Sequence, residues 1–160
     1  MKTLYLLRHA EAAPGTPDHQ RALTSAGKMA ARHLGFIMQE RGYNPAHILC
    51  SDARRTRETL AMLAPENGAA ARFDEKIYGA GVGDLLAMVQ AAGDVSSLLM
   101  VGHNPAVHGF ARVLAGSGRH VAVLDVQYPP CTLSVLTSDA DWADWAPGCA
   151  VLADLLLGGR

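Results

Sequence analysis

Two histidines follow two apolar segments of the chain, and their surroundings suit phosphate chemistry. The first segment, residues 3–7, is followed by Arg8 and His9. The second, residues 97–101, is followed after one glycine by His103. A neutral imidazole can attack phosphorus, and an adjacent guanidinium can hold the negatively charged oxygens during that attack. The pattern therefore predicts phosphoryl-group chemistry if the fold brings the two histidines together.

The expected reaction needs positive groups around the phosphoryl oxygens, because negative charge is spread over them in the transition state. Arg8 suits this task better than a lysine would, since a guanidinium donates paired N–H groups and stays charged. His9 is the predicted nucleophile, forming a phosphohistidine that water then opens without a metal or other cofactor. We expect His103 to donate an N–H to the phosphoryl group, and Asn104 to contact the substrate at a helix start.

Short apolar segments alternate with longer helical patterns, which is typical of a mostly parallel sheet with helices on both faces. The predicted strands are residues 3–7, 47–50, 71–74, 97–101 and 131–136. The predicted helices run from a Thr24 cap to about 41, from about 53 after a Ser51-Asp52 cap to before Pro65, from 83, and from 104. In such sheets ligands bind at the carboxyl ends of strands, so both histidines are expected at one site.

Three later segments allow less definite predictions. Residues 116–130 stay open, because 121–126 suits either a strand or a helical turn and Pro129-Pro130 is a poor strand interior. Trp142 and Trp145 are expected to pack at an edge. The apolar residues 151–157 are expected to pack over the sheet. The whole chain, 1–160, is predicted to be a single α/β domain, a three-layer sandwich with a central mixed sheet.

Four motifs occur in an order that is similar to a known enzyme family. They are Leu7 to Ala12, Arg21 to Gly27, Ser51 to Thr59 and Gly102 to Pro105, and they span two thirds of the chain. The set resembles the histidine phosphatase superfamily, the phosphoglycerate-mutase-like enzymes, and its spacing resembles the short SixA-like branch of phosphohistidine phosphatases. This resemblance implies that His9 is phosphorylated and that Arg8, Arg55 and His103 bind the phosphoryl group.

The choice of Arg55 depends on the family motif. There, a serine precedes the phosphate-binding arginine by four positions, and from Ser51 that count reaches Arg55. This segment departs from the family pattern at Asp52 and Glu58, where the family often has Pro and Gln. Arg54 is therefore the alternative.

A proton donor for the leaving group is harder to find in the sequence. Glu75 and Tyr78 follow the third predicted strand, and Asp18 lies in the loop of residues 13–20 that we expect to form the rim of the site. None of the three stands in a recognisable acid motif. A protonated imidazole leaves phosphorus more readily than an alkoxide, so a phosphohistidine substrate tolerates a missing acid.

Composition excludes several classes of protein. The chain carries 14 Lys and Arg against 15 Asp and Glu, so no basic excess favours nucleic acid. The apolar segment at the amino terminus is too short for a secretory signal, and no apolar run is long enough to span a membrane. Three cysteines without metal-ligand spacing indicate reduced thiols, no metal site and a cytoplasmic protein.

The sequence thus predicts a metal-independent phosphatase that removes phosphate from phosphohistidine on a signalling partner, such as a phosphotransfer domain. A phosphomonoesterase acting on a small phosphorylated metabolite or nucleotide is the first alternative. A non-catalytic, phosphate-dependent binding module is the second. The identity of the substrate, the proton donor and the oligomeric state stay open.

Overall fold

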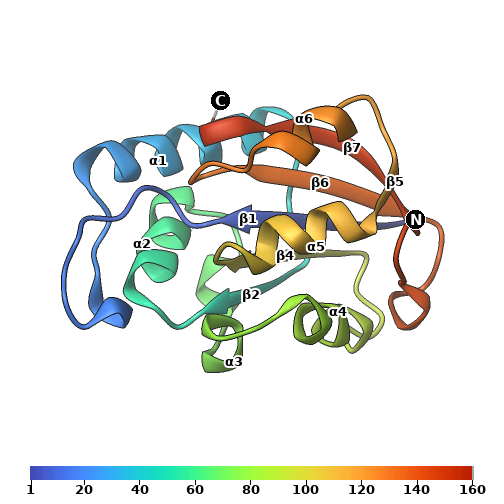
Figure 1. Ribbon diagram of the computed structural model, residues 1–160, viewed down its shortest axis with the longest axis horizontal. Helices are drawn as coiled ribbons and strands as arrows, with labels where there is room; N and C mark the ends of the chain where they lie inside the picture. Colours follow the sequence, from blue (N-terminus) through green and yellow to red (C-terminus); the bar gives the residue numbers. More distant parts are fainter. Residues whose placement is uncertain (160) are drawn as a thin grey trace.

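Seven strands form one mixed sheet in the computed structural model, which describes residues 1–159 (Figure 1). The strand order is β3-β2-β4-β1-β6-β7-β5. The strands are β1 (Lys2–Arg8), β2 (His47–Ser51), β3 (Arg72–Asp74), β4 (Ser97–Gly102), β5 (Ala115–Ser117), β6 (Leu133–Ser138) and β7 (Ala150–Leu156). Strands β1 to β4 pair in parallel, whereas β6 runs antiparallel to both β1 and β7. The predicted mixed, mostly parallel sheet is confirmed.

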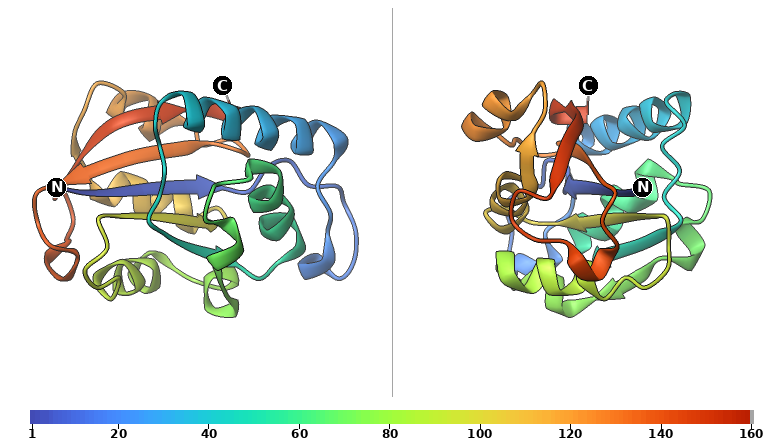
Figure 2. Two further views of the ribbon diagram at one scale, coloured as in Figure 1. Left: turned by 180° about the vertical axis from the view of Figure 1, so that it is seen from behind. Right: turned by 90° about the vertical axis from the view of Figure 1, so that its right-hand side faces the viewer.

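Helices cover both faces of this sheet. They are α1 (Ser25–Glu40), α2 (Arg54–Leu63), α3 (Glu75–Tyr78), α4 (Val82–Gln90), α5 (Ala106–Leu114) and α6 (Val121–Val126). Short 3-10 turns span Asp18–Gln20, Gly68–Ala70, Trp142–Asp144 and Leu157–Gly159. The right-hand view of Figure 2 shows α1 and α2 on one side of the sheet and α5 and α6 on the other. The three-layer α/β architecture is therefore confirmed.

The core has two halves, because successive side chains of a strand point to opposite faces of the sheet. In β1, Leu4 and Leu6 pack with residues of α4 and α5, whereas Tyr5 and Leu7 pack with residues of α1 and α2. A shift of one residue would exchange the two sets, and burial on both faces therefore fixes the register of β1. That register determines where Arg8, the last residue of β1, leaves the sheet.

Local signals explain the ends of α1. The Thr24 hydroxyl accepts a hydrogen bond from the Gly27 amide at 2.9 Å, so Thr24 is the predicted N-cap. The helix ends at Glu40 with Arg41 as its C-cap, and the chain turns away at Gly42, whose φ of +69° lies in the left-handed region that glycine adopts without strain. The Ser51-Asp52 cap predicted for α2 is wrong by one residue, since Ala53 is the N-cap.

The C-terminal third differs most from the sequence prediction. Residues 121–126 form α6, and residues 150–156 are a strand within the sheet instead of a segment packed over it. The strand predicted from Cys131 begins only at Leu133, because Cys131 has a φ of +61° that no strand residue adopts.

The two tryptophans lie in the core, not at an edge. Trp142 and Trp145 are at most 1% exposed, their ring centroids are 4.7 Å apart, and the 3-10 turn that begins with Trp142 contacts α4. Among residues 1–159, no helix combines the length and apolar character that a bilayer crossing needs.

Candidate active site

The two predicted histidines lie at the carboxyl ends of adjacent parallel strands. His9 follows β1, His103 follows β4, and Arg8 is aligned with Gly102 in the parallel register. The His9 amide donates to the Gly102 carbonyl at 3.1 Å, and the two imidazole centroids are 5.4 Å apart. The structure thus brings together the two residues that the sequence placed at separate strand ends.

His9 is held as a neutral imidazole with one free nitrogen. Its Nδ1 lies 2.7 Å from the Ala10 carbonyl oxygen, which can only accept a hydrogen bond, so Nδ1 carries the proton. The lone pair of Nε2 is then available for attack. The pKa of His9 is lowered from 6.5 to about 4, chiefly by burial; the Ala10 hydrogen bond acts to raise it, and the charges of Arg55 and Arg8 act to lower it. The imidazole is therefore unprotonated at neutral pH.

His103 is oriented by Ser51, the last residue of β2. The Ser51 hydroxyl oxygen accepts from the Ala53 amide at 3.3 Å and lies 2.7 Å from His103 Nε2. If the Ser51 hydroxyl donates to Nε2, the remaining ring proton of the neutral imidazole is on Nδ1, which is buried without a partner. Burial, followed by the charge of Arg55, lowers the pKa of His103 to about 3. His103 can then donate Nδ1–H to an anion.

Arg8 is anchored by a segment that sequence reasoning left open. One of its terminal nitrogens donates to the Tyr128 carbonyl oxygen at 3.0 Å, while its buried Nε has no partner among the described residues. The Asn104 side-chain amide donates to the same carbonyl at 3.0 Å, and the Asn104 side-chain oxygen accepts from the His108 amide at 3.2 Å. Asn104 is thus engaged in supporting the site, and no spacing signal pointed to Tyr128.

Arg55 occupies the site, and Arg54 does not. The Arg55 side chain is 8% exposed and donates to the backbone carbonyl and the carboxylate of Asp18 at 2.9 and 3.1 Å. Arg54 is 55% exposed and forms an ion pair with Glu58 on the surface of α2. Counting four positions from Ser51 in the sequence therefore led to the arginine that is buried.

Three nitrogens of this cluster are buried without a hydrogen-bond partner. Within residues 1–159, four buried side-chain polar atoms lack a partner, and three of them are Arg8 Nε, Arg55 Nε and His103 Nδ1. An unpaired buried donor costs free energy, so most native structures satisfy such groups with protein, water or ligand. Two of these donors belong to guanidinium groups, which bind phosphate through paired N–H bonds. The cluster is chemically suited to bind an oxyanion next to His9.

The three candidate proton donors differ in position. The Tyr78 ring packs edge-on against the His103 ring at 5.4 Å, and its hydroxyl donates to the Asp18 carboxylate. The Tyr78 hydroxyl, Arg21 and Arg55 together hold the pKa of Asp18 well below its usual range, so this carboxylate stays ionised. The bond to Asp18 raises the pKa of Tyr78. Glu75 is exposed and lines a different groove.

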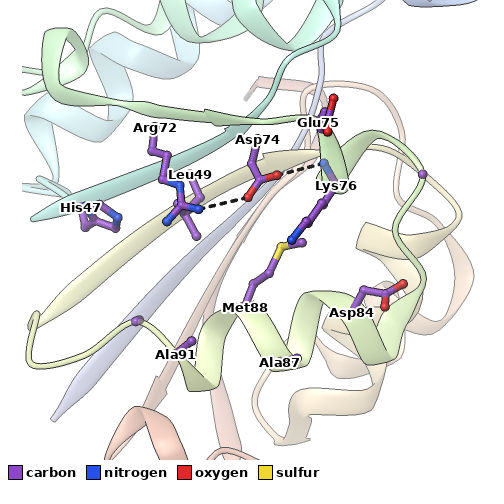
Figure 3. A pocket seen from close by; sticks show the side chains of 12 residues that line it. His47, Leu49, Arg72, Asp74, Glu75, Lys76, Asp84, Ala87, Met88 and Ala91 are labelled. Carbon is purple, nitrogen blue, oxygen red and sulfur yellow. Dashed lines mark hydrogen bonds and ion pairs between the residues drawn. The ribbon is translucent and has the colours of Figure 1, made fainter.

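That groove lies between β2, β3 and α4 and has a volume of about 670 Å³. Figure 3 shows Asp74 within reach of Arg72 and the Lys76 amide, with Met88 on the α4 side. None of His9, His103 and the two arginines lines it. The groove therefore does not take part in the chemistry of the histidine cluster.

His19 is a residue of the site that sequence reasoning missed. Its Nε2 lies 2.9 Å from the Asp52 carboxylate, and its ring packs edge-on against Tyr78 at 4.9 Å. The rings of His9, His103, Tyr78 and His19 thus form a continuous row from the buried His9 to the partly exposed His19. The position of His19, two residues before the motif that starts at Arg21, was the available signal in the sequence. Among residues 1–159, no group of His, Cys, Asp and Glu has a metal-binding arrangement.

Comparison with known proteins supports the family resemblance. The model of the histidine phosphatase superfamily (branch 1) matches residues 4–92. An uncharacterized protein of Mycobacterium tuberculosis is 37% identical over 153 residues, which cover 91% of this chain and 96% of that protein.

Solved structures agree in both sequence and fold. A candidate phosphohistidine phosphatase SixA of Nakamurella multipartitia has a TM-score of 0.83 and 34% identity, covering 97% of this chain and 95% of its own. A protein histidine phosphatase SixA complexed with tungstate shares the fold, with a TM-score of 0.78 and 20% identity, covering 98% of this chain and 97% of its own. With its two strand-end histidines and the match over residues 4–92, the chain belongs to the histidine phosphatase superfamily, in its SixA-like branch.

Proposed function

We propose that this phosphatase removes phosphate from phosphohistidine on a partner protein, through a covalent phosphohistidine on His9. The observation that carries the proposal is the set of three unpartnered nitrogens, Arg8 Nε, Arg55 Nε and His103 Nδ1, in the cluster around a neutral imidazole. The ring centroid of His103 lies 5.4 Å from that of His9, so an oxyanion bound at His103 would lie beside His9. Such pre-positioned donors supply much of the stabilisation of a phosphoryl-transfer transition state.

The reaction would proceed in two displacements. In the first, the lone pair of His9 Nε2 forms a P–N bond while the P–N bond of the substrate breaks, and the leaving imidazole retains its electron pair and a proton gained from solvent. In the second, water attacks phosphorus and gives up a proton to solvent, the bond to His9 breaks, and inorganic phosphate is released. His9 returns to the neutral form that its Ala10 hydrogen bond favours.

The proton-donor candidates support an imidazole leaving group over an alkoxide. Asp18 is ionised, Tyr78 donates its only hydroxyl proton to Asp18, and Glu75 lines another groove. An alkoxide needs a proton from a positioned acid in most phosphatases, whereas an imidazole can be protonated by solvent before it leaves. The rings of Tyr78 and His19, at the outer end of the row, also offer aromatic surface to a histidine side chain presented by another protein.

The test compares two substrate classes on the same enzyme. One is a phosphotransfer domain phosphorylated on histidine, with free phosphohistidine as a small control, and the other is a panel of phosphate esters that includes metabolites and nucleotides. We expect the highest kcat/KM for the phosphorylated protein. Strong and selective turnover of one ester would instead support the small-molecule phosphatase.

A second measurement tests covalent catalysis. Brief exposure to labelled substrate, quenched at alkaline pH where phosphoramidates survive, should leave phosphate on His9 when the protein is mapped by mass spectrometry. The His9→Ala variant should fold, lose turnover and carry no label. Unchanged turnover in His9→Ala would refute covalent catalysis, and anion binding without turnover of either class would support the non-catalytic binding module.

A further inference from the structure

Asp18, in the rim loop of residues 13–20, contacts the buried Arg55 through both its backbone and its side chain. The Asp18 backbone carbonyl accepts from one terminal nitrogen of Arg55 at 2.9 Å, and the Asp18 carboxylate accepts from the other at 3.1 Å. The same carboxylate accepts from Arg21 at 3.0 Å and from the Tyr78 hydroxyl. One exposed loop residue therefore holds a buried arginine by two bonds, and two neighbours hold that loop residue.

These bonds occupy a particular edge of the guanidinium group. A guanidinium has an outer edge, formed by its two terminal nitrogens, and a side edge, formed by Nε and one terminal nitrogen. Asp18 engages both terminal nitrogens of Arg55, whereas Nε is buried with no partner among the described residues. Asp18 thus fixes the outer edge and leaves Nε available for a ligand.

Arg8 is held in a comparable way. One terminal nitrogen of Arg8 donates to the Tyr128 carbonyl, and Arg8 Nε is likewise buried without a partner. Both arginines of the cluster therefore have a terminal nitrogen fixed by a distant segment and their Nε available. The Tyr128 partner is a neutral backbone carbonyl, so it does not occupy the place of a phosphate. The same arrangement at both arginines therefore favours a role of these contacts in orienting the side chains.

We infer that Asp18 is a positioning residue of the reaction, which orients Arg55 so that its Nε edge binds the phosphoryl group, while Tyr78 and Arg21 fix Asp18. The inference rests on the proposed role of Arg55 in binding that group. The opposite account makes Asp18 a competitor whose carboxylate must be displaced by phosphate. The Asp18 side chain is 52% exposed, so water screens its charge from the bound anion, whereas its direct hydrogen bonds to Arg55 persist.

The two accounts predict opposite changes in anion affinity. Titration calorimetry with tungstate and with inorganic phosphate would compare the wild type with Asp18→Ala, Asp18→Asn and Arg55→Ala. Loss of a charge-assisted hydrogen bond lowers affinity by about tenfold or more, and we expect this loss in Asp18→Ala. Asp18→Asn keeps an acceptor oxygen for Arg55 and should recover most of the affinity, within about threefold of the wild type.

Kinetics and a control variant separate positioning from a general loss of structure. Asp18→Ala should raise KM and lower kcat together, with Asp18→Asn restoring both, while urea unfolding shows a folded protein in each case. Asp125→Ala removes a carboxylate of similar exposure from a surface ion pair with Arg112, and it should leave affinity and kinetics unchanged.

Each outcome points to one conclusion. If the wild type binds neither anion, or if Arg55→Ala binds as tightly as the wild type, the proposed function of the site is wrong. If Arg55→Ala loses binding while Asp18→Ala retains it, the positioning role is wrong and the function stands. Tighter binding by Asp18→Ala would show that Asp18 competes with phosphate, which also overturns the inference.

Discussion

Acidification should destabilise the protein through His9 and His103, because the folded state keeps both imidazoles neutral. Their pKa values are lowered from 6.5 to about 4 and about 3. In the unfolded chain each histidine takes up a proton near its ordinary pKa, whereas the folded protein does not. Stability is therefore fully present above about pH 6.5 and falls as the pH drops toward the folded pKa values.

The magnitude follows from the two pKa values of each histidine. Between about pH 7.5 and about pH 5.5, each group lowers the free energy of unfolding by about 1.3 kcal/mol, and the pair by about 2.7 kcal/mol. Asp18 and Asp154 contribute little in this interval, because their pKa values are lowered from an ordinary value of 3.8, which already lies below the interval. The interval therefore covers the pH range in which His9 and His103 take up protons in the unfolded chain.

Urea unfolding in phosphate-free buffers at the two pH values measures this effect. We expect His9→Gln to lose about half as much stability on acidification as the wild type, and the exposed His33→Gln to behave as the wild type. An equal loss in His9→Gln and the wild type would refute the assignment of a neutral, buried imidazole at His9. Imidazole NMR titration gives an independent result, since a His9 signal that titrates near pH 6.5 contradicts the same reasoning.

Three further predictions concern the site and its support. Arg55→Lys should lower phosphate affinity about tenfold or more, because an ammonium cannot reproduce the forked hydrogen bonds, while Arg54→Lys should change it less than about twofold; equal effects of the two would contradict the assignment. Thr24→Ala should lower the free energy of unfolding by about 1 kcal/mol through loss of the α1 cap, and no change in urea unfolding would count against it. Gly27→Ala should destabilise strongly, because its Cβ would lie 2.2 Å from the Glu11 carbonyl oxygen, whereas Gly83→Ala in α4 meets no atom within 4 Å and should stabilise by about 0.5 kcal/mol or more. If both glycine variants unfold at the same urea concentration, the clash with the Glu11 carbonyl does not lower the free energy of unfolding and the prediction is wrong.

Sequence patterns predicted most of the elements that carry the two histidines. The segments before His9 and His103 are short, apolar and followed by polar residues, and both proved to be strands. The Thr24 cap and the Gly42 stop are local signals, and both were correct. The 150–156 strand was missed, because an apolar segment at the end of a chain can pack as a strand or over a sheet, and only its partner decides.

The sequence by itself determined the chemistry-bearing residues at the two strand ends, since their types and spacing are local properties and their motifs resemble one family. The tertiary structure decided which arginine of residues 54–57 is buried and which residue it contacts. Arg55 meets Asp18 across 37 positions, and Arg8 meets the Tyr128 carbonyl across 120. Such partners have no signature in local spacing, because a hydrogen bond depends on positions in space that only the packed sheet and its loops define.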